Sequence, residues 1–297
     1  MGCCASSPAA LEGAKDPAHT RAKPPDKELQ VLKIKKEDAK RREQHWKVTG
    51  IVGLRSNNLK ALPKAVLDLG PHVRTLDASD NKIGKLPPTI GMLTQLTRLI
   101  LQQNQLTVLP PEIGQLVQLR VLQVDRNQLS ALPDEVGLLQ KLEKLTAAGN
   151  KMTSLPVAVG QLKALVELDV SKNRLTSLPP SLSGCASLQE LRAPANELSA
   201  LPDELSDATE LRTLDLDGNP LSKLPSDLLR GCGKLHTLSA HGTSIRVEDL
   251  EKLEGYAAFE ARRQGKYTKQ LAGNAMGSKR GFDEGVDRDL YKFPGSR

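Results

Sequence analysis

Aromatic residues are scarce in this chain and make up only 2% of its 297 residues. Aromatic side chains are the usual platforms on which bases and flat cofactors stack. Charge does not favour nucleic acid either, because residues 49–247 carry 21 Lys and Arg against 19 Asp and Glu and hold no basic stripe. We therefore expect no nucleic-acid partner and no cofactor pocket lined by aromatic rings.

Cysteine and long apolar stretches are also rare. The chain has four cysteines, Cys3, Cys4, Cys185 and Cys232, no run of eighteen apolar residues and no secretory hydrophobic segment at its start. Disulfide frameworks belong to oxidising compartments, and secreted chains begin with an apolar signal segment. These absences predict a protein of the reducing cytosol.

No pattern of catalytic or metal-binding residues stands out. The five histidines lie outside any metal-ligand spacing, and the glycine-rich patterns that bind phosphate are missing. His236 and His241 have no Ser or Cys nucleophile in register with them. Because an activity must be argued from a site, we predict a protein that is not an enzyme and that holds no metal or cofactor.

One pattern is written eight times between residues 49 and 235. A representative copy, residues 119–133, reads L-x-x-L-x-V-x-x-N-x-L-x-x-L-P. The asparagine recurs at spacings of 23 residues from Asn81 to Asn219. A period of 20–29 residues with this pattern is the leucine-rich-repeat signature. The eight asparagines are Asn57, Asn81, Asn104, Asn127, Asn150, Asn173, Asn196 and Asn219.

Each half of the repeat predicts its own local structure. The L-x-L core alternates with period two, which predicts a short strand with one buried face. At the turn that follows, buried backbone groups lack ladder partners, and an Asn amide can satisfy them. Stacked asparagines should therefore form a structural ladder. The second half, L-P-x-x-I/V-G-x-L, predicts one or two helical or 3₁₀ turns on the convex side. Gly91, Gly114, Gly137 and Gly160 are expected to interrupt these turns early.

The first six residues form a second motif. Met1-Gly2-Cys3-Cys4-Ala5-Ser6 matches the N-myristoylation pattern M-G-x-x-x-[ST], in which the acyl group is placed on Gly2. Cys3 and Cys4 lie beside it and suit S-palmitoylation. One acyl chain binds membranes marginally, whereas two signals anchor stably. The motif predicts a peripheral protein at the cytoplasmic face of the plasma membrane or of endomembranes.

The repeats divide the chain into five segments. Residues 1–28 have few large apolar side chains and predict a disordered, lipidated tether. Residues 29–48 predict an N-terminal cap, which a solenoid needs to cover its outermost repeat. Residues 49–247 form the leucine-rich-repeat solenoid, with a parallel concave sheet and short convex helices or 3₁₀ turns. In residues 248–271, Leu250, Leu253, Ala257 and Ala261 recur at helical spacing and predict one capping helix. Residues 272–297 predict a flexible tail.

The repeat form and both ends of the solenoid resemble a known family. The 23-residue L-P-x-x-I-G-x-L form is similar to the intracellular, Ras-group-type leucine-rich-repeat proteins. Thr49-Gly50-Ile51-Val52 and Leu250-x-x-Leu253-Glu254-Gly255-Tyr256 resemble the ends of the leucine-rich-repeat-containing protein 57 family. This resemblance covers roughly residues 38–270. It implies a short, lipid-anchored cytoplasmic protein that binds other proteins, and it implies no enzymatic chemistry.

The positions beside the strand leucines should point to the concave surface. From repeat four to repeat eight they carry charge of both signs, and the preceding repeats are rich in amides. A protein partner of complementary charge fits such a surface. The predicted partner-binding residues are Asp125, Arg126, Asp169, Lys172, Arg174, Arg192, Asp215 and Asp217.

Two functions remain open at this point. The first is a membrane-tethered adaptor or scaffold that binds a signalling protein, for example a small GTPase or a phosphatase. The second is a soluble cytosolic regulatory subunit or scaffold without a lipid anchor. We expect a monomer in either case.

Overall fold

A computed structural model describes residues 40–275, with side chains described as far as residue 266 and at residue 268. The chain divides into two units, Met1–Arg42 and Glu43–Arg297, and all repeats belong to the second. The predicted acylation sites Gly2, Cys3 and Cys4, the tether 1–28 and the segment 276–297 lie outside the described residues. The same holds for residues 29–39 of the predicted N-terminal cap.

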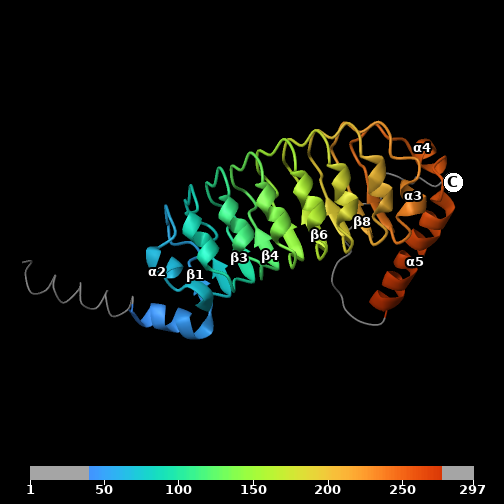
Figure 1. The fold of residues 1–297 in the computed structure, drawn as a ribbon. Coiled ribbons are helices and arrows are strands. Elements are labelled where there is room, and N and C mark those ends of the chain that lie inside the picture. Colours follow the sequence, from blue (N-terminus) through green and yellow to red (C-terminus); the bar gives the residue numbers. More distant parts are fainter. Residues whose placement is uncertain (1–39, 276–297) are drawn as a thin grey trace, which may run out of the picture. The chain divides into compact units, whose positions relative to one another are not determined.

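The strands of the described region form one parallel sheet of nine, in chain order (Figure 1). Each strand has three residues, and the same repeat positions pair throughout, so Leu99 lies opposite Leu122 and Leu122 opposite Leu145. This arrangement confirms the predicted leucine-rich-repeat solenoid. The strands are β1 (Ile51–Gly53), β2 (Thr75–Asp77), β3 (Arg98–Ile100), β4 (Val121–Gln123), β5 (Lys144–Thr146), β6 (Glu167–Asp169), β7 (Glu190–Arg192), β8 (Thr213–Asp215) and β9 (Thr237–Ser239).

Short 3₁₀ helices line the side of the solenoid opposite the sheet. In each of the inner repeats a Pro in extended conformation precedes the helix, as Pro110 does with φ −71° and ψ 147°. Proline suits this place because its ring fixes φ and it has no N–H to leave unpaired. The helices are η1 (Gly70–His72), η2 (Pro88–Met92), η3 (Pro111–Gln115), η4 (Asp134–Leu138), η5 (Val157–Gln161), η6 (Pro180–Gly184) and η7 (Asp203–Asp207), with α2 (Lys64–Leu67) and α3 (Leu228–Gly231) in the outer repeats.

The glycines of these helices have a different role from the one expected. Gly137 does not end η4 but lies inside it. A Cβ built on Gly137 would lie 2.6 Å from the backbone oxygen of Ala158 in η5 of the next repeat. Gly114 stands in the same relation to Glu135, at 2.8 Å. The repeat therefore has glycine at this position because neighbouring 3₁₀ helices are in close contact. The prediction that these glycines interrupt the helical turns early was wrong.

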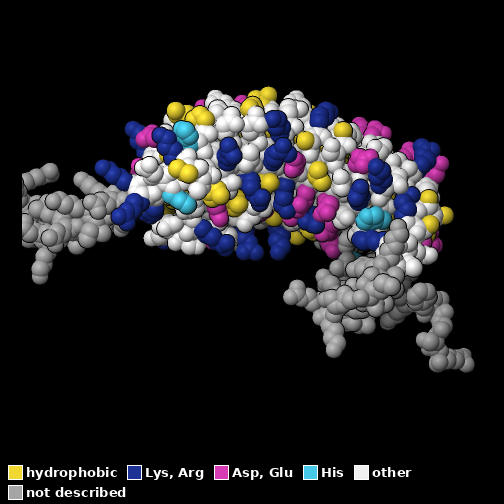
Figure 2. All heavy atoms as spheres, turned by 90° about the horizontal axis from the view of Figure 1, so that it is seen from below, with side chains coloured by type: hydrophobic (Ala, Val, Ile, Leu, Met, Phe, Trp, Pro, Cys, Tyr) yellow, Lys and Arg dark blue, Asp and Glu magenta, His cyan; other side chains and the backbone are white. Residues whose placement is uncertain are grey.

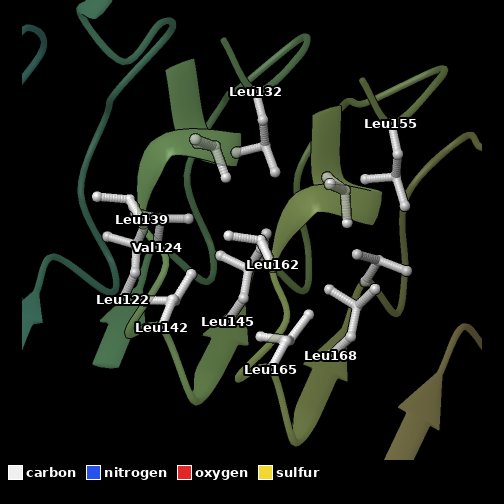
Figure 3. Packing of buried hydrophobic residues seen from close by; sticks show 14 of the residues in the cluster. Leu122, Val124, Leu132, Leu139, Leu142, Leu145, Leu155, Leu162, Leu165 and Leu168 are labelled. Carbon is white, nitrogen blue, oxygen red and sulfur yellow. The ribbon is translucent and has the colours of Figure 1, made fainter. Parts of the chain in front are cut away.

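The core between sheet and helices is aliphatic. Figure 3 shows how successive repeats contribute the same positions, such as Leu122, Leu145 and Leu168 from the strands. All three are fully buried. Cys185 and Cys232 occupy core positions that hold leucine in other repeats, and burial raises the pKa of each thiol to about 11. Both cysteines are buried and free.

The asparagines bind their own repeat to the preceding one. Asn127 is buried, and its Nδ2 donates to the backbone oxygens of Leu101 at 3.0 Å, Val124 at 3.0 Å and Asp125 at 3.2 Å. Its Oδ1 accepts from the N–H of Leu106 at 3.0 Å. The same pattern recurs at the inner positions. The buried members of the series are Asn81, Asn104, Asn127, Asn150, Asn173, Asn196 and Asn219, whereas Asn57 is exposed.

The residue before each asparagine adopts the left-handed conformation. It has φ between 52° and 67° before all eight asparagines, and Gly242 has the same conformation before Thr243, which takes the place of asparagine in the ninth repeat. Only three of these nine residues are glycine. L-residues pay a steric cost in this region, so the backbone turn into the asparagine is imposed by the repeat. The nine residues are Ser56, Asp80, Gln103, Arg126, Gly149, Lys172, Ala195, Gly218 and Gly242.

Two helices close the C-terminal end where one was expected. α4 (Val247–Glu251) and α5 (Tyr256–Ala275) are separated by a bend at Gly255, whose φ is 89°. Leu250 and Leu253 of the predicted helical stripe are partly buried against the core, whereas Ala257 and Ala261 are exposed, so the alanine half of the stripe was wrong. Phe259 is buried instead, and Arg262 donates from Nε to the backbone oxygen of Leu235 at 2.8 Å. An aromatic ring and an arginine thus hold α5 against the end of the core.

A helical segment precedes the first strand. Residues 40–49 are helical, and Trp46 in the second half of this segment is partly buried against the core. The N–H of Gly50 donates to the backbone oxygen of Trp46 at 2.7 Å. This contact ties the end of the helix to the start of β1.

Candidate functional site

The sheet face is the surface on the outer side of the strands. In each repeat it is formed by two pairs of side chains. The first pair flanks the buried leucine of the strand, and the second pair comes directly after the next buried residue along the chain. Strand side chains alternate between two faces, so Lys144 and Thr146 both point away from the core that holds Leu145. On the side of the solenoid seen in Figure 2, basic and acidic side chains are interspersed, and no field of one sign covers it. The sheet face likewise mixes both signs.

A hollow of about 630 Å³ lies in the sheet face between β3 and β7. Five predicted partner-binding residues line it: Asp125, Arg126, Asp169, Lys172 and Arg192. Arg174, Asp215 and Asp217 do not belong to its lining. The structure therefore brings together part of the predicted strip and leaves its C-terminal part outside.

The hollow exists because the fifth repeat has small side chains. Thr146, Ala148 and Gly149 occupy the outward positions there. The equivalent positions of the fourth repeat hold Gln123, Asp125 and Arg126, which are much larger. The two neighbouring repeats on either side thus form the walls, and the fifth repeat forms the floor.

Asp125 is held by its neighbours inside the wall. Its Oδ2 accepts from Gln102 Nε2 at 2.9 Å and from Thr146 Oγ1 at 2.6 Å, and its Oδ1 accepts from the N–H of Ala148 at 2.8 Å. Three donors from two flanking repeats fill much of the capacity of one carboxylate. Asp125 therefore joins the repeats to one another more than it offers a charge to a partner.

Glu167 is the centre of an ion-pair network on the floor and far wall. It lies 2.7 Å from Lys144 Nζ and 3.1 Å from Arg192 Nη1, and Arg192 Nη2 lies 2.6 Å from Glu190. Lys144 and Arg192 are therefore already paired. Asp169 accepts from both the N–H and the hydroxyl of Ser171, which fixes its side chain against the backbone.

Arg126 and Lys172 differ from these paired charges. Both are exposed, and the described part of the chain gives neither of them an ion pair. They occupy the same repeat position, on opposite sides of Gly149. The free charge at the rim of the hollow is therefore positive.

The C-terminal part of the predicted strip is a separate group of charges. Burial is the largest influence on Asp215 and raises the pKa of its carboxyl, and the charges of Asp217 and Asp169 act in the same direction, against the hydrogen bond from the backbone N–H of Asp217. Asp217 accepts from Ser239 Oγ at 2.7 Å and from the N–H of His241 at 2.7 Å. Arg174 is exposed and follows the buried Asn173. These contacts stabilise the eighth and ninth repeats.

Ser239, His241 and Asp217 lie together, contrary to the expectation that His241 has no nucleophile in register. Ser239 Oγ is 3.0 Å from His241 Nδ1. The arrangement is not that of a catalytic triad, because Ser239 donates directly to the carboxylate and His241 does not stand between them. Asp125 makes the same bridge to Thr146 and Ala148, where no histidine is present. The cluster is thus a repeat-to-repeat bridge.

Sequence reasoning missed one column of the sheet face. Lys144, Glu167 and Glu190 stand just before the strand leucine, whereas the predicted strip was built from positions after it. The same period-two alternation places both flanks of the leucine on one face. The pattern therefore contained the signal for this column.

Two further observations bound the chemistry of residues 40–275. Within this range no group of His, Cys, Asp and Glu side chains is arranged to hold a metal ion. None of the helices there is both long and apolar enough to cross a bilayer.

Comparison with known proteins identifies the family. A leucine-rich repeat region model matches residues 110–248, and a Leucine Rich Repeat model matches residues 72–93 and 95–116. Plant intracellular Ras-group-related LRR protein 7 of Oryza sativa subsp. japonica is 63% identical over 246 residues, which cover 83% of this chain and 94% of that protein. The chain belongs to the plant intracellular Ras-group-related leucine-rich-repeat proteins. This confirms the resemblance seen in the repeats.

Other members and relatives match over shorter stretches. Plant intracellular Ras-group-related LRR protein 8 of the same rice is 41% identical over 75 residues, which cover 25% of this chain and 20% of that protein. The chain therefore spans only a fifth of the length of that relative. Proteins built of leucine-rich repeats are typically interaction scaffolds that use the concave face. The family is generally without enzymatic activity.

Solved structures of other leucine-rich-repeat proteins share the fold of this Ras-group-related chain. The ectodomain of the plant membrane receptor kinase GASSHO1/SCHENGEN3 from Arabidopsis thaliana, in complex with CASPARIAN STRIP INTEGRITY FACTOR 2, aligns with a TM-score of 0.61 and 28% identity. The alignment covers 69% of this chain and 26% of the ectodomain. An internalin from Listeria monocytogenes aligns with a TM-score of 0.55 and 20% identity, over 66% and 62% of the two chains.

Proposed function

We propose that this protein is a non-enzymatic scaffold that binds a signalling protein on its sheet face and is tethered to the cytoplasmic side of a membrane by N-terminal acylation. The observation that carries the binding part is the hollow between β3 and β7, whose rim holds two exposed cations without ion pairs in the described region. The rice relative is named as intracellular and Ras-group-related. A small GTPase or a phosphatase is the class of partner that we would test first.

The alternative is a soluble cytosolic regulatory subunit that uses the same face without a lipid anchor. The sheet face supports both versions equally. They differ only in the chemistry of Gly2, Cys3 and Cys4, so membrane fractionation separates them.

The binding face can be tested by charge reversal at exposed cations. We expect the combined variant Arg126→Glu, Lys172→Glu and Arg174→Glu to lose capture of the principal partner at least tenfold, because like charges across an interface are costly. All three side chains are exposed, so stability should change by no more than about 0.5 kcal/mol per site. Affinity capture with mass spectrometry and thermal melting measure the two effects. Reversing Asp169, Arg192 and Asp215 would be a poorer test, since each makes internal contacts.

A matched control reverses the same charge elsewhere. Lys60, Lys85 and Lys223 are exposed and lie outside the strands and outside the lining of the hollow. Their combined change to Glu alters the net charge equally and should leave capture intact. If the control loses the partner and the sheet-face variant keeps it, the face has been assigned to the wrong side.

The anchor can be tested by removing the acylation site. We expect the wild-type chain to pellet with membranes from cells and Gly2→Ala to remain in the supernatant, because the acyl group needs the amine of a glycine. Cys3→Ser combined with Cys4→Ser should leave only weak, reversible binding, since one myristoyl chain gives an association constant of about 10⁴ M⁻¹. A Gly2→Ala protein that still pellets would favour an anchor at another place and rule out this one.

A further inference from the structure

The acidic groups of the hollow are already occupied. Asp125 accepts three hydrogen bonds, Glu167 is paired with Lys144 and Arg192, and Asp169 accepts from Ser171. A basic group of a partner would have to break these contacts to find a carboxylate. The hollow therefore disfavours a cationic occupant.

The two exposed cations are placed to act together. Arg126 and Lys172 have φ of 52° and 53°, so their side chains leave equivalent backbones in the same direction. Strands of a sheet lie about 4.8 Å apart, which sets these backbones roughly 10 Å from each other. Long arginine and lysine side chains can converge across that separation on one group.

Within the described repeats, the position between the two cations carries no side chain. Gly149 occupies the same repeat position in the repeat between them and has no side chain. Beneath it the floor is formed by Ala148 and Thr146, and the hollow of about 630 Å³ is large enough for several side chains of an entering segment. An acidic side chain can therefore reach both cations from above the glycine.

We propose that the hollow receives an acidic side chain, Asp or Glu, of a protein segment, which Arg126 and Lys172 hold between them above Gly149. The inference rests on the proposed scaffold function and names the chemistry of its partner. Charge-assisted hydrogen bonds from Arg and Lys to a carboxylate supply both affinity and orientation. An extended anionic surface, such as a lipid bilayer or nucleic acid, fits less well because the cations of the lining that have no ion pair in the described region are two, Arg126 and Lys172, which suit one carboxylate and not a row of phosphates.

The chain itself provides conservative replacements for the test. The third repeat has Gln103 at the position of Arg126 and Lys172, with φ of 54°, so Arg126→Gln and Lys172→Gln should fold. Lys151→Gln is the control, because Lys151 is exposed, does not line the hollow and has Gln105 and Gln128 at its position in preceding repeats.

The experiment selects binders from a displayed library of random twelve-residue peptides with the full chain. The tightest peptide and its acid-to-amide version are then measured by fluorescence anisotropy against wild type, the double variant and Lys151→Gln. We expect an acidic residue to be enriched among the selected peptides. Its change to the amide should weaken binding to wild type and to Lys151→Gln by about five- to tenfold, and should leave binding to the double variant unchanged within about twofold.

Three outcomes would overturn the inference. The acidic contact is refuted if the selected peptides lack an acidic residue. It is also refuted if the change from acid to amide weakens binding to the double variant as much as binding to wild type. Both results are compatible with a scaffold that binds through its sheet face. If no peptide is retained and the chain sediments with phosphatidylserine vesicles through Arg126 and Lys172, the face binds lipid. In that case the scaffold function fails together with the inference.

Discussion

Changing Asn127 to alanine is expected to lower the free energy of unfolding by about 1–3 kcal/mol, because it leaves a buried backbone donor without an acceptor. The carbonyls of Leu101 and Val124 keep a second donor, from Asn104 and Asn150 respectively. The N–H of Leu106 donates to Asn127 Oδ1 and loses this acceptor. Denaturant unfolding of the purified chain measures the change.

Two neighbouring changes serve as controls. Gln128→Ala removes an exposed side chain that accepts from Lys151, and should change stability by less than about 0.5 kcal/mol. Asn57→Ala should cost less than Asn127→Ala, since Asn57 is exposed and its Nδ2 donates to Arg55 of its own repeat. Equal losses for Asn127→Ala and Gln128→Ala would mean that the asparagine ladder contributes nothing to stability.

Changing Gly137 to alanine is the second substitution with a large expected effect. The added methyl would lie 2.6 Å from the backbone oxygen of Ala158 and 2.9 Å from its Cβ. Overpacking of this kind costs about 1–3 kcal/mol, since a backbone oxygen in the next repeat cannot rotate away as a side chain can. We expect a lower melting temperature and a lower free energy of unfolding.

Gly84→Ala should have the opposite sign. A Cβ at Gly84 meets no atom within 4 Å. Alanine there mainly restricts the unfolded chain, which stabilises a protein by about 0.4–1 kcal/mol. Should Gly137→Ala and Gly84→Ala shift the melting temperature alike, the close approach of the 3₁₀ helices would not be what selects glycine.

Much of the fold could be predicted from the repeat itself. The period of 23 residues and the alternation around Leu122 and Leu145 determine which residues form strands and which face is buried. The number of closing helices could not be predicted in this way, because residues 248–271 have no repeat. Helical spacing correctly suggested Leu250 and Leu253 as contacts, but it also suggested Ala257 and Ala261. On α5 the contacts are made instead by residues such as Phe259 and Arg262. Tertiary packing at a solenoid end overrides a short helical pattern.

The candidate site was predictable as a face and not as a set of residues. Asp125 and Arg126 are neighbours in sequence and looked alike, yet one is bonded within the wall and the other is exposed at the rim. That difference depends on contacts with Gln102 and Ala148 in adjacent repeats. The three small residues of the fifth repeat can be read from the sequence, but that they leave a hollow depends on the larger side chains of the repeats on either side.

The direction of the asparagine bonds bears on how the chain folds as it is made. The Oδ1 of Asn127 accepts from Leu106, which belongs to the preceding repeat, and Asn150 does the same for Leu129. A ribosome delivers the N-terminal repeats first. The turn of each newly synthesised repeat therefore lacks a hydrogen-bond acceptor until the asparagine of the following repeat, about one period later in the chain, has been synthesised. Folding should advance along the nascent chain one repeat behind synthesis, with the most recent coil always the least stable.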